Sequence, residues 1–330
     1  MANFRAYRIY NEDGKIQARL VEATLDDLDP GEVVIKTAFS SVNYKDALAA
    51  TGAGKIIRRF PCIGGVDACG TVISSSDARF KPGDEVICTS YDLGVAHDGG
   101  YAEYMRVPAG WVVPLPRRMT LIESMQLGTA GFTAGLAVER MEHEGLESRK
   151  GPVIVTGATG GVGSIAVDIL AKAGYDVTAL TGKEAETDYL KRLGAKQIML
   201  RSSLDLSRIK PLDKATWAGA VDNLGGDVLA WLASTMQIGG ALASIGLAAS
   251  HTLNTTVMPF ILRGVSLLGV DSVNAPMSLR QKVWQRLASD LKPVHLADIC
   301  NTVTLDELPA VFDRLLKGQA RGRTVVKLGG

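Results

Sequence analysis

Cysteine is scarce in this chain of 330 residues, and its four cysteines form no CxxC pair and no regular spacing. Neither a four-thiolate zinc site nor a disulfide framework is therefore expected. The four histidines also lack the mutual spacing that is typical of metal ligands. We interpret the cysteines as small hydrophobic residues buried in a protein of the reducing cytosol. They are Cys62, Cys69, Cys88 and Cys300.

An excess of charge of either sign is also missing. Lys and Arg number 36 against 35 Asp and Glu, a net charge of +1, and no basic run occurs. Binding to nucleic acid or to an anionic membrane through bulk charge is therefore not expected. The longest stretch without charged residues, 228–262, is interrupted by Gly, His, Asn and Pro. No apolar run reaches the roughly 18 residues of a membrane span. The first fifteen residues lack an apolar signal core, which predicts a cytoplasmic protein.

Short strands separated by turns are typical of the first 120 residues. Segments 33–39, 70–73 and 85–88 read as strands, and Gly and Pro punctuate the chain between them. This pattern predicts a small barrel-like β domain. The length of the chain is that of about two domains.

From about residue 122 the pattern changes to alternating strands and helices, which predicts a parallel sheet covered on both faces. The tail is β-like again near its end, so we expect the chain to return to the first domain. The predicted boundaries are 1–124 with 296–330 for the β domain, and 125–295 for the α/β domain.

A glycine-rich turn carries the strongest motif. It runs from Thr156 to Ser164, between an apolar strand and an amphipathic helix. In this context glycines let backbone N–H groups reach a pyrophosphate at a helix N-terminus, as in dinucleotide-binding folds. The spacing is GxxGxxG, and a turn without a ligand is the alternative. The cofactor contacts predicted here are Thr159, Gly160, Gly161 and Val162.

The end of the next strand distinguishes NADPH from NADH. An NAD site places an acidic residue there for the ribose hydroxyls, whereas this strand ends in Thr181, Gly182 and Lys183. A hydroxyl and an ammonium suit a 2′-phosphate, and Arg201 follows the third strand. Glu184 weakens this interpretation, and solvated surface charges are the alternative. The sequence favours NADPH.

These features, in the order β domain then glycine turn, resemble the medium-chain dehydrogenase/reductase superfamily over essentially the whole chain. Gly128–Ala134 is similar to the helix that precedes the coenzyme domain there, and Val66–Val72 is similar to the GHExxGxV stretch. The resemblance implies a GroES-like β-barrel domain and a Rossmann domain, an α/β fold. Val66 replaces the zinc-binding His, and Asn43–Asp46 replaces the segment with the Cys ligand, so no zinc is expected.

Longer blocks resemble the zinc-free YhdH/YhfP-type quinone-oxidoreductase family, which includes NADPH-dependent acrylyl-CoA reductases. The resemblance implies further cofactor contacts at Leu247, Ile261 and Ser272, and core packing is the alternative for Leu247 and Ile261. It also implies a homodimer formed through an edge strand near residues 265–270. The blocks are Ser41–Leu48, Gly54–Arg58, Gly128–Thr133, Trp217–Ala220, Thr256–Arg263, Gly269–Ser272 and Gly322–Lys327.

Without a metal to polarise a carbonyl, the substrate must already be activated. A conjugated enone or enoyl thioester fits, because hydride addition at the β-carbon gives an enolate that is protonated at the α-carbon. Tyr44 is the candidate proton donor and lies beside the nicotinamide by resemblance, with Asn43 and Asp46 as further catalytic candidates. In the alternative, Tyr44 is an aromatic wall, water gives the proton, and the other two residues only cap a turn.

We therefore predict an NADPH-dependent reductase of a small molecule, most specifically of acrylyl-CoA to propanoyl-CoA. Reduction of quinones or free enones is the second hypothesis. A non-catalytic NADPH-binding sensor or RNA-binding module is the third. Three lone arginines can meet phosphates of CoA or of the cofactor, or have no ligand role: Arg263, Arg321 and Arg323.

Overall fold

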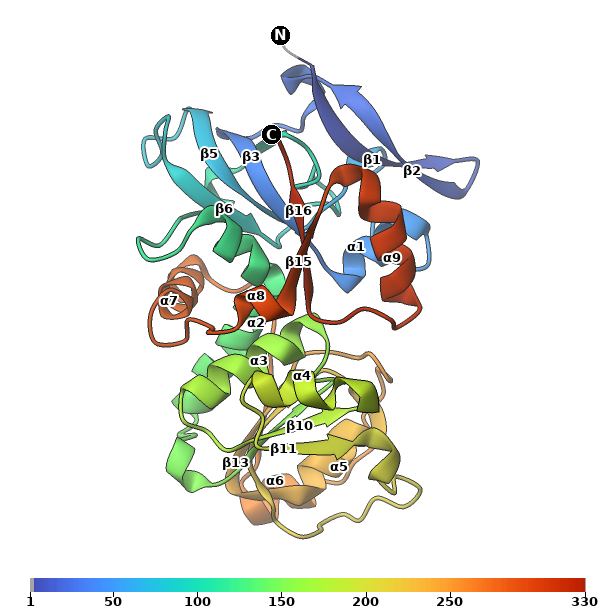
Figure 1. Ribbon diagram of the computed structural model, residues 1–330, viewed down its shortest axis with the longest axis vertical. Helices are drawn as coiled ribbons and strands as arrows, with labels where there is room; N and C mark the ends of the chain where they lie inside the picture. The colour runs from blue at the N-terminus through green and yellow to red at the C-terminus, as the bar shows by residue number, and fades with distance from the viewer. Residues whose placement is uncertain (1–2, 330) are drawn as a thin grey trace. The chain divides into compact units, whose positions relative to one another are not determined.

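The computed structural model describes residues 3–329 (Figure 1). Contacts divide the chain into two compact units. The first extends to Thr129 and includes Val273–Lys282 and the chain from Cys300 onward, and the second comprises Ala130–Ser272 and Val283–Ile299. The predicted boundaries instead placed 273–282 with the α/β part, and the domain boundaries stay a prediction.

Two sheets build the first unit. A three-stranded sheet has the order β2-β1-β4, and a seven-stranded sheet has the order β15-β16-β3-β5-β6-β8, with β7 also paired to β3. β16 runs antiparallel to β3, so the red end of the chain lies beside a blue strand in Figure 1. This pairing makes the first unit discontinuous in sequence. The strands are β1 (Phe4–Glu12), β2 (Lys15–Ala23), β3 (Val33–Val42), β4 (Cys62–Ile63), β5 (Asp67–Ser75), β6 (Glu85–Thr89), β7 (Tyr104–Val107), β8 (Val112–Pro114), β15 (Cys300–Val303) and β16 (Arg323–Lys327).

Helices α1 (Tyr44–Thr51) and α9 (Leu308–Leu316) pack on this unit's main core. Asn43 is the N-cap of α1, and the carboxylate of Asp46 accepts the Asn43 backbone N–H at 2.7 Å. This capping box fixes where the helix begins. The helix therefore starts at Tyr44, directly after β3 ends.

Helix α2 (Leu121–His143) is interrupted at Gly128, whose φ of 52° and ψ of −154° are not helical. The segment 128–134, which resembles a helix of the family, lies within α2 and begins at this kink. The division between the units falls at Thr129, directly after this kink. Helix α7 (Met277–Leu287) also crosses a division, at Lys282.

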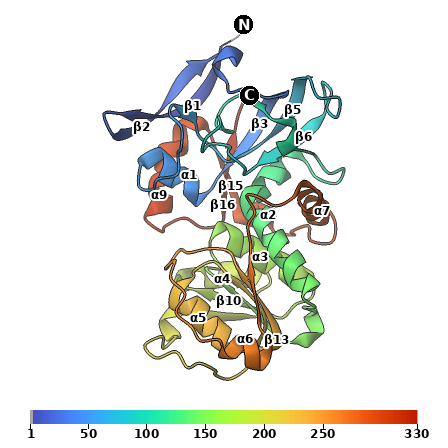
Figure 2. The ribbon, with the colours of Figure 1, turned by 180° about the vertical axis from the view of Figure 1, so that it is seen from behind.

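The second unit is a six-stranded parallel sheet in the order β11-β10-β9-β12-β13-β14. Counted along the unit this order is 3-2-1-4-5-6, the doubly wound Rossmann arrangement. Helices α3 and α4 lie in front of the sheet in Figure 1, and α5 and α6 lie in front of it in Figure 2. Both faces are covered, which explains why strands such as β9 are buried along their whole length. The bounds are β9 (Val153–Thr156), α3 (Gly161–Lys172), β10 (Val177–Thr181), α4 (Thr187–Arg192), β11 (Gln197–Leu200), β12 (Trp217–Asp222), α5 (Gly226–Thr235), β13 (Met236–Ser244), α6 (Met258–Arg263), β14 (Ser266–Gly269) and α8 (Leu296–Ile299).

Within residues 3–329, no helix is both long and apolar enough to cross a membrane.

Candidate active site

A buried carboxylate, Asp67, is the centre of a polar cluster in the first unit. It begins β5, and its side chain is closed to solvent. Its Oδ2 accepts hydrogen bonds from Ser41 Oγ at 2.6 Å, from Asn43 Nδ2 at 2.7 Å and from the Thr129 backbone N–H at 2.9 Å. Its Oδ1 accepts from Thr129 Oγ1 at 2.5 Å. Four donors thus satisfy this anion without water.

The guanidinium of Arg323, on β16, completes the cluster and is only 3% exposed. It donates to Ser41 Oγ at 2.7 Å, to the Val42 carbonyl at 2.8 Å and to Asn43 Oδ1 at 3.1 Å. One of its nitrogens lies 3.8 Å from Asp67 Oδ2. Of the two possibilities for Arg323, contact with a phosphate or no ligand role, these contacts favour the second, because its guanidinium is occupied inside the unit.

Asp46 is a second buried carboxylate next to this cluster. It accepts the backbone N–H groups of Asn43 at 2.7 Å and of Val66 at 3.1 Å. Burial raises the pKa of Asp46 to about 7, and the nearby charge of Asp67 acts in the same direction. A carboxyl that titrates near neutral pH beside a candidate reaction site is typical of functional clusters.

Tyr44 differs from these neighbours because its side chain is 54% exposed. It is the first residue of α1, directly after the capped Asn43. Within residues 3–329 its hydroxyl has no hydrogen-bond partner. The structure thus brings Asn43, Tyr44 and Asp46 together at one helix start, where Asp46 is buried, Asn43 is half-buried and Tyr44 is exposed.

The glycine turn of the second unit joins β9 to α3. A Cβ added to Gly163 would lie 2.3 Å from the carbonyl oxygen of Gly157, so only glycine permits this turn. At Gly160, the N-cap of α3, the same construction meets one atom, at 3.3 Å. The turn therefore leaves open space beside the backbone at the start of α3. The first N–H groups of this helix lack acceptors within the helix. This arrangement fits a dinucleotide pyrophosphate.

Side-chain hydrogen bonds fix the strand ends beneath this turn. Thr156 Oγ1 donates to Asp222 Oδ1 at 2.7 Å, and Asn223 Nδ2 donates to the Thr156 carbonyl at 2.7 Å. β9 and β12 are adjacent parallel strands. Their carboxyl ends are thus held together at the edge where ligands bind in such sheets.

The two cationic candidates for a 2′-phosphate follow adjacent strands of this sheet. Thr181 pairs in register with Leu200, so Lys183 and Arg201 leave β10 and β11 at the same edge. The buried Thr181 Oγ1 accepts the Lys183 backbone N–H at 3.0 Å, which orders the residue after the strand. No acidic side chain ends β10.

The remaining predicted contacts lie in the second unit, where Leu247 and Ser272 follow the adjacent parallel strands β13 and β14 at the same edge of the sheet. Leu247 is 67% exposed and Ile261, on α6, is 71% exposed. These fractions exclude core packing within the chain as their role. Ser272 is half-buried. Arg263 donates to the carbonyls of Ser234, Met236 and Asp213.

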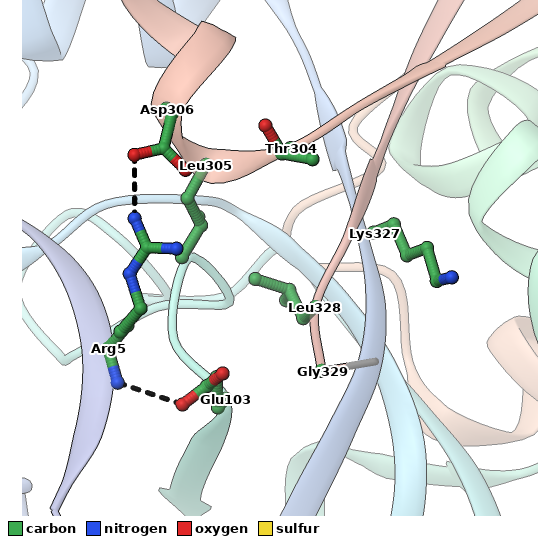
Figure 3. A pocket seen from close by; sticks show the side chains of 8 residues that line it. All are labelled: Arg5, Glu103, Thr304, Leu305, Asp306, Lys327, Leu328 and Gly329. Carbon is green, nitrogen blue, oxygen red and sulfur yellow. Dashed lines mark hydrogen bonds and ion pairs between the residues drawn. The ribbon is translucent and has the colours of Figure 1, made fainter.

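A shallow pocket elsewhere in the first unit, with a volume of about 260 Å³, contains none of the predicted site residues (Figure 3). Its Arg5 forms an ion pair with Asp306 at 2.7 Å, and the Arg5 backbone N–H donates to Glu103 at 2.9 Å. The polar groups of this pocket are thus partly engaged with one another.

Comparison with known proteins gives one consistent family. Residues 29–117 match the alcohol dehydrogenase GroES-like domain, and residues 161–289 match the zinc-binding dehydrogenase family. The putative quinone oxidoreductase YhfP of Bacillus subtilis is 49% identical over 98% of this chain and 99% of its own. The chain belongs to the YhdH/YhfP-type family of medium-chain dehydrogenases/reductases. The predicted family and fold class are confirmed, and the protein is an oxidoreductase.

Two other members of the YhdH/YhfP-type family are similar along nearly the whole chain. The acrylyl-CoA reductase AcuI of Ruegeria pomeroyi is 46% identical over 96% of both chains. The YhdH oxidoreductase of Salmonella enterica, solved in complex with NADP, is 45% identical with a TM-score of 0.96 over 98% of this chain and 100% of that one. The YhfP structure, solved with NAD bound, has a TM-score of 0.97 over 99% and 100%.

The sequence analysis did not identify Asp67, Ser41, Thr129 or the buried role of Arg323. One signal was present for Asp67, because it follows Val66 in the stretch that resembles GHExxGxV. The replacement of the zinc-binding His by Val66 does not by itself indicate a role for the neighbouring acid. Among residues 3–329, no three His, Cys, Asp or Glu residues are grouped so that they could hold a metal ion.

The four thiols are unsuited to nucleophilic chemistry. Burial raises the pKa of each thiol to about 12. Because the thiolate is the reactive form, we expect these cysteines to be unreactive in the folded chain. Cys62, Cys69 and Cys88 are buried, as interpreted, whereas Cys300 is only half-buried.

Proposed function

We propose that this protein transfers a hydride from NADPH to an activated carbon–carbon double bond, with acrylyl-CoA reduced to propanoyl-CoA. The observation that carries the proposal is the exposed Tyr44 at the start of α1, directly after Asn43, whose side chain donates to the buried Asp67. Such an arrangement offers a proton and hydrogen-bond donors rather than a metal. The similarity to AcuI along 96% of both chains supports the substrate.

The residues of the second unit would hold NADPH, which supplies the hydride when bound. Backbone N–H groups at Gly160, Gly161 and Val162 would bind the pyrophosphate, with Thr159 beside them. Lys183 and Arg201 would bind the 2′-phosphate, with Thr181 and Gly182 shaping the turn. Leu247, Ile261 and Ser272 would contact the nicotinamide half.

The residues of the first unit would serve the substrate. Hydride addition to the β-carbon breaks the π bond between the α- and β-carbons and moves its electron pair toward the carbonyl oxygen, so hydrogen-bond donors there lower the barrier. Tyr44 would then give its proton to the α-carbon and recover one from water. The overall reaction consumes one NADPH and one proton. We infer that no zinc takes part.

The test is the oxidation of NADPH with acrylyl-CoA, crotonyl-CoA and a simple benzoquinone, repeated with Tyr44→Phe. We expect turnover with acrylyl-CoA and a loss on the order of 10²-fold in kcat for Tyr44→Phe. Turnover of the quinone with neither thioester would refute the CoA substrate and favour quinone reduction, which the name of the 49% identical YhfP suggests. Tight NADPH binding without any turnover would instead indicate a sensor.

Cofactor choice is a separate prediction. Lys183→Ala should raise the KM for NADPH about 10- to 100-fold and leave that for NADH nearly unchanged, because a charge-assisted hydrogen bond contributes about 1.5–3 kcal/mol. Steady-state kinetics with both cofactors measures the effect. Lys191→Ala, which removes an exposed lysine on α4, is the control and should change neither KM. Equal losses for both cofactors would contradict the assignment.

We also propose a homodimer formed along β14, the last strand in the sheet order. Its outer edge has no partner strand in the part of the chain that the structure describes. Exposed apolar side chains lie on β14 and the nearby α6, including Leu267 at 37% and Leu262 at 58%. An edge of this kind invites pairing with a second copy. Sedimentation velocity should give twice the chain mass, and a monomer at micromolar concentration would refute it.

A further inference from the structure

The carboxamide of Asn43 is held at both ends by buried groups of opposite charge. Its Nδ2 donates to Asp67 at 2.7 Å, and its Oδ1 accepts from Arg323 at 3.1 Å. Exchanging the oxygen and nitrogen would place two donors against each other on one side and two acceptors on the other. The contacts therefore fix the orientation of the amide, as well as its position.

In this orientation one hydrogen of the Asn43 amide has no acceptor among residues 3–329. Nδ2 carries two hydrogens, and Asp67 takes one of them. Within residues 3–329 no acceptor for the second is found, and Asn43 is only half-buried. The Asn43 side chain thus has one donor available to a ligand, next to the exposed Tyr44.

The charges of the cluster are a weak means of stabilising a fold. Asp67 and Arg323 are 0% and 3% exposed, and ions buried to this degree lose much of their attraction to desolvation. Well-packed apolar residues would often be equally stable at such positions. What the ions supply is direction, because each one accepts or donates only along defined hydrogen bonds. Their geometry converges on Asn43 and Ser41.

We propose that Asp67 and Arg323 are positioning residues, which hold Asn43 so that its second amide hydrogen is donated to the substrate's carbonyl oxygen. This inference rests on the proposed function. As hydride reaches the β-carbon, negative charge gathers on that oxygen, and a donor already oriented toward it needs no rearrangement. Asn43 is then the catalytic donor, while Asp67 and Arg323 act only through it.

A double-mutant cycle tests this dependence, using whichever acceptor the wild-type protein reduces. Asn43→Ala should lower kcat on the order of 10²-fold, as the loss of an oxyanion donor does. Asp67→Asn should lower kcat about 10- to 100-fold by misplacing the donor. In the double variant the loss should match that of Asn43→Ala alone to within about twofold, because Asp67 has nothing left to position. The Kd for NADPH should stay within about threefold throughout, since every predicted cofactor contact except Tyr44 lies in the second unit and none of these variants changes Tyr44.

Two results would overturn the proposal. One is a double variant whose loss is the product of the single losses, which would mean that Asp67 acts independently of Asn43. The other is an Asn43→Ala variant that keeps kcat within about threefold. If Asp67→Asn does not fold, Arg323→Lys takes its place, because one ammonium cannot serve Ser41, Val42 and Asn43 together.

A matched control separates positioning from general loosening. Ser40 Oγ donates at 2.6 Å to the backbone carbonyl of Asp67 and is fully buried. Ser40→Ala should therefore lower the unfolding midpoint and leave kcat within about twofold. A loss in kcat equal to that of Asp67→Asn would refute positioning. If the protein reduces a quinone and no thioester, the CoA substrate fails while this cycle, measured with the quinone, still decides the roles of Asp67 and Asn43.

Discussion

Gly128→Ala should destabilise the protein by at least about 3 kcal/mol and abolish most of its activity. The φ of 52° and ψ of −154° at this position lie in a region that is essentially restricted to glycine, and strain of this kind costs about 1–3 kcal/mol. A Cβ would also lie 2.5 Å from Ser41 Oγ, 2.6 Å from Asp67 Oδ2 and 2.7 Å from Arg323 Nη2. All three groups are buried. Displacing them would break a buried charged network, which costs a further 3–5 kcal/mol or so.

Chemical denaturation of both proteins measures the change in the free energy of unfolding. Gly318→Ala is the control, because Gly318 also has a positive φ, of 67°, but a Cβ there meets no atom within 4 Å. The control should lose about 1–2 kcal/mol from backbone strain alone. If Gly128→Ala costs no more than the control, the polar cluster tolerates displacement and its rigidity, on which the role of Asn43 depends, is disproved.

The kink at Gly128 marks the limit of what the sequence predicts here. Gly128–Ala134 resembles a helix of the family, and nothing local reveals that its first residue faces Ser41, Asp67 and Arg323. Those partners are 87, 61 and 195 residues away in sequence. The need for glycine arises from this convergence, which depends on how β3, β5 and β16 pair. The periodicity of apolar residues along the sequence does not predict which distant strands pair.

The second unit was easier to predict for the opposite reason. Its strands succeed one another along the chain, and the glycine turn follows the first of them, so the motif and the sheet order imply each other. Lys183 and Arg201 leave neighbouring strands at one edge, as their positions after two predicted strands indicate. Strands that follow one another in the sequence are thus mostly neighbours in the sheet.

Between these cases lies Asp46, whose position was predicted but whose ionisation was not. Its place three residues after Asn43 is a capping signal. Its pKa depends on burial and on Asp67, which only the folded chain supplies. A residue that looks like a helix cap therefore also becomes a group that titrates near neutral pH.

Asp46 should make the folded state less stable as the pH rises from about 4 to about 7. Burial, with the charge of Asp67, raises its pKa to about 7 in the folded chain, whereas an unfolded Asp titrates near 3.9. Between these values the unfolded state has lost the proton and the folded state keeps it. The unfolded state then binds fewer protons, so the free energy of unfolding falls with pH by up to about 1.4 kcal/mol per pH unit. The stabilising contribution is complete below about pH 4 and is lost above about pH 7.

Asp46→Asn should remove this dependence, because an amide is neutral in both states. The difference in unfolding free energy between wild type and variant should therefore shrink by a few kcal/mol from pH 4 to pH 7.5. Burial also raises the pKa of Asp98 and Asp222, but both proteins share these groups and their effects cancel in the difference. Parallel curves would mean that Asp46 stays ionised when folded, with its charge balanced by the N–H groups of Asn43 and Val66 and by Lys45. Curves of unfolding free energy that converge as the pH rises would show that Asp46 holds a proton beside Asn43 and Tyr44 near neutral pH.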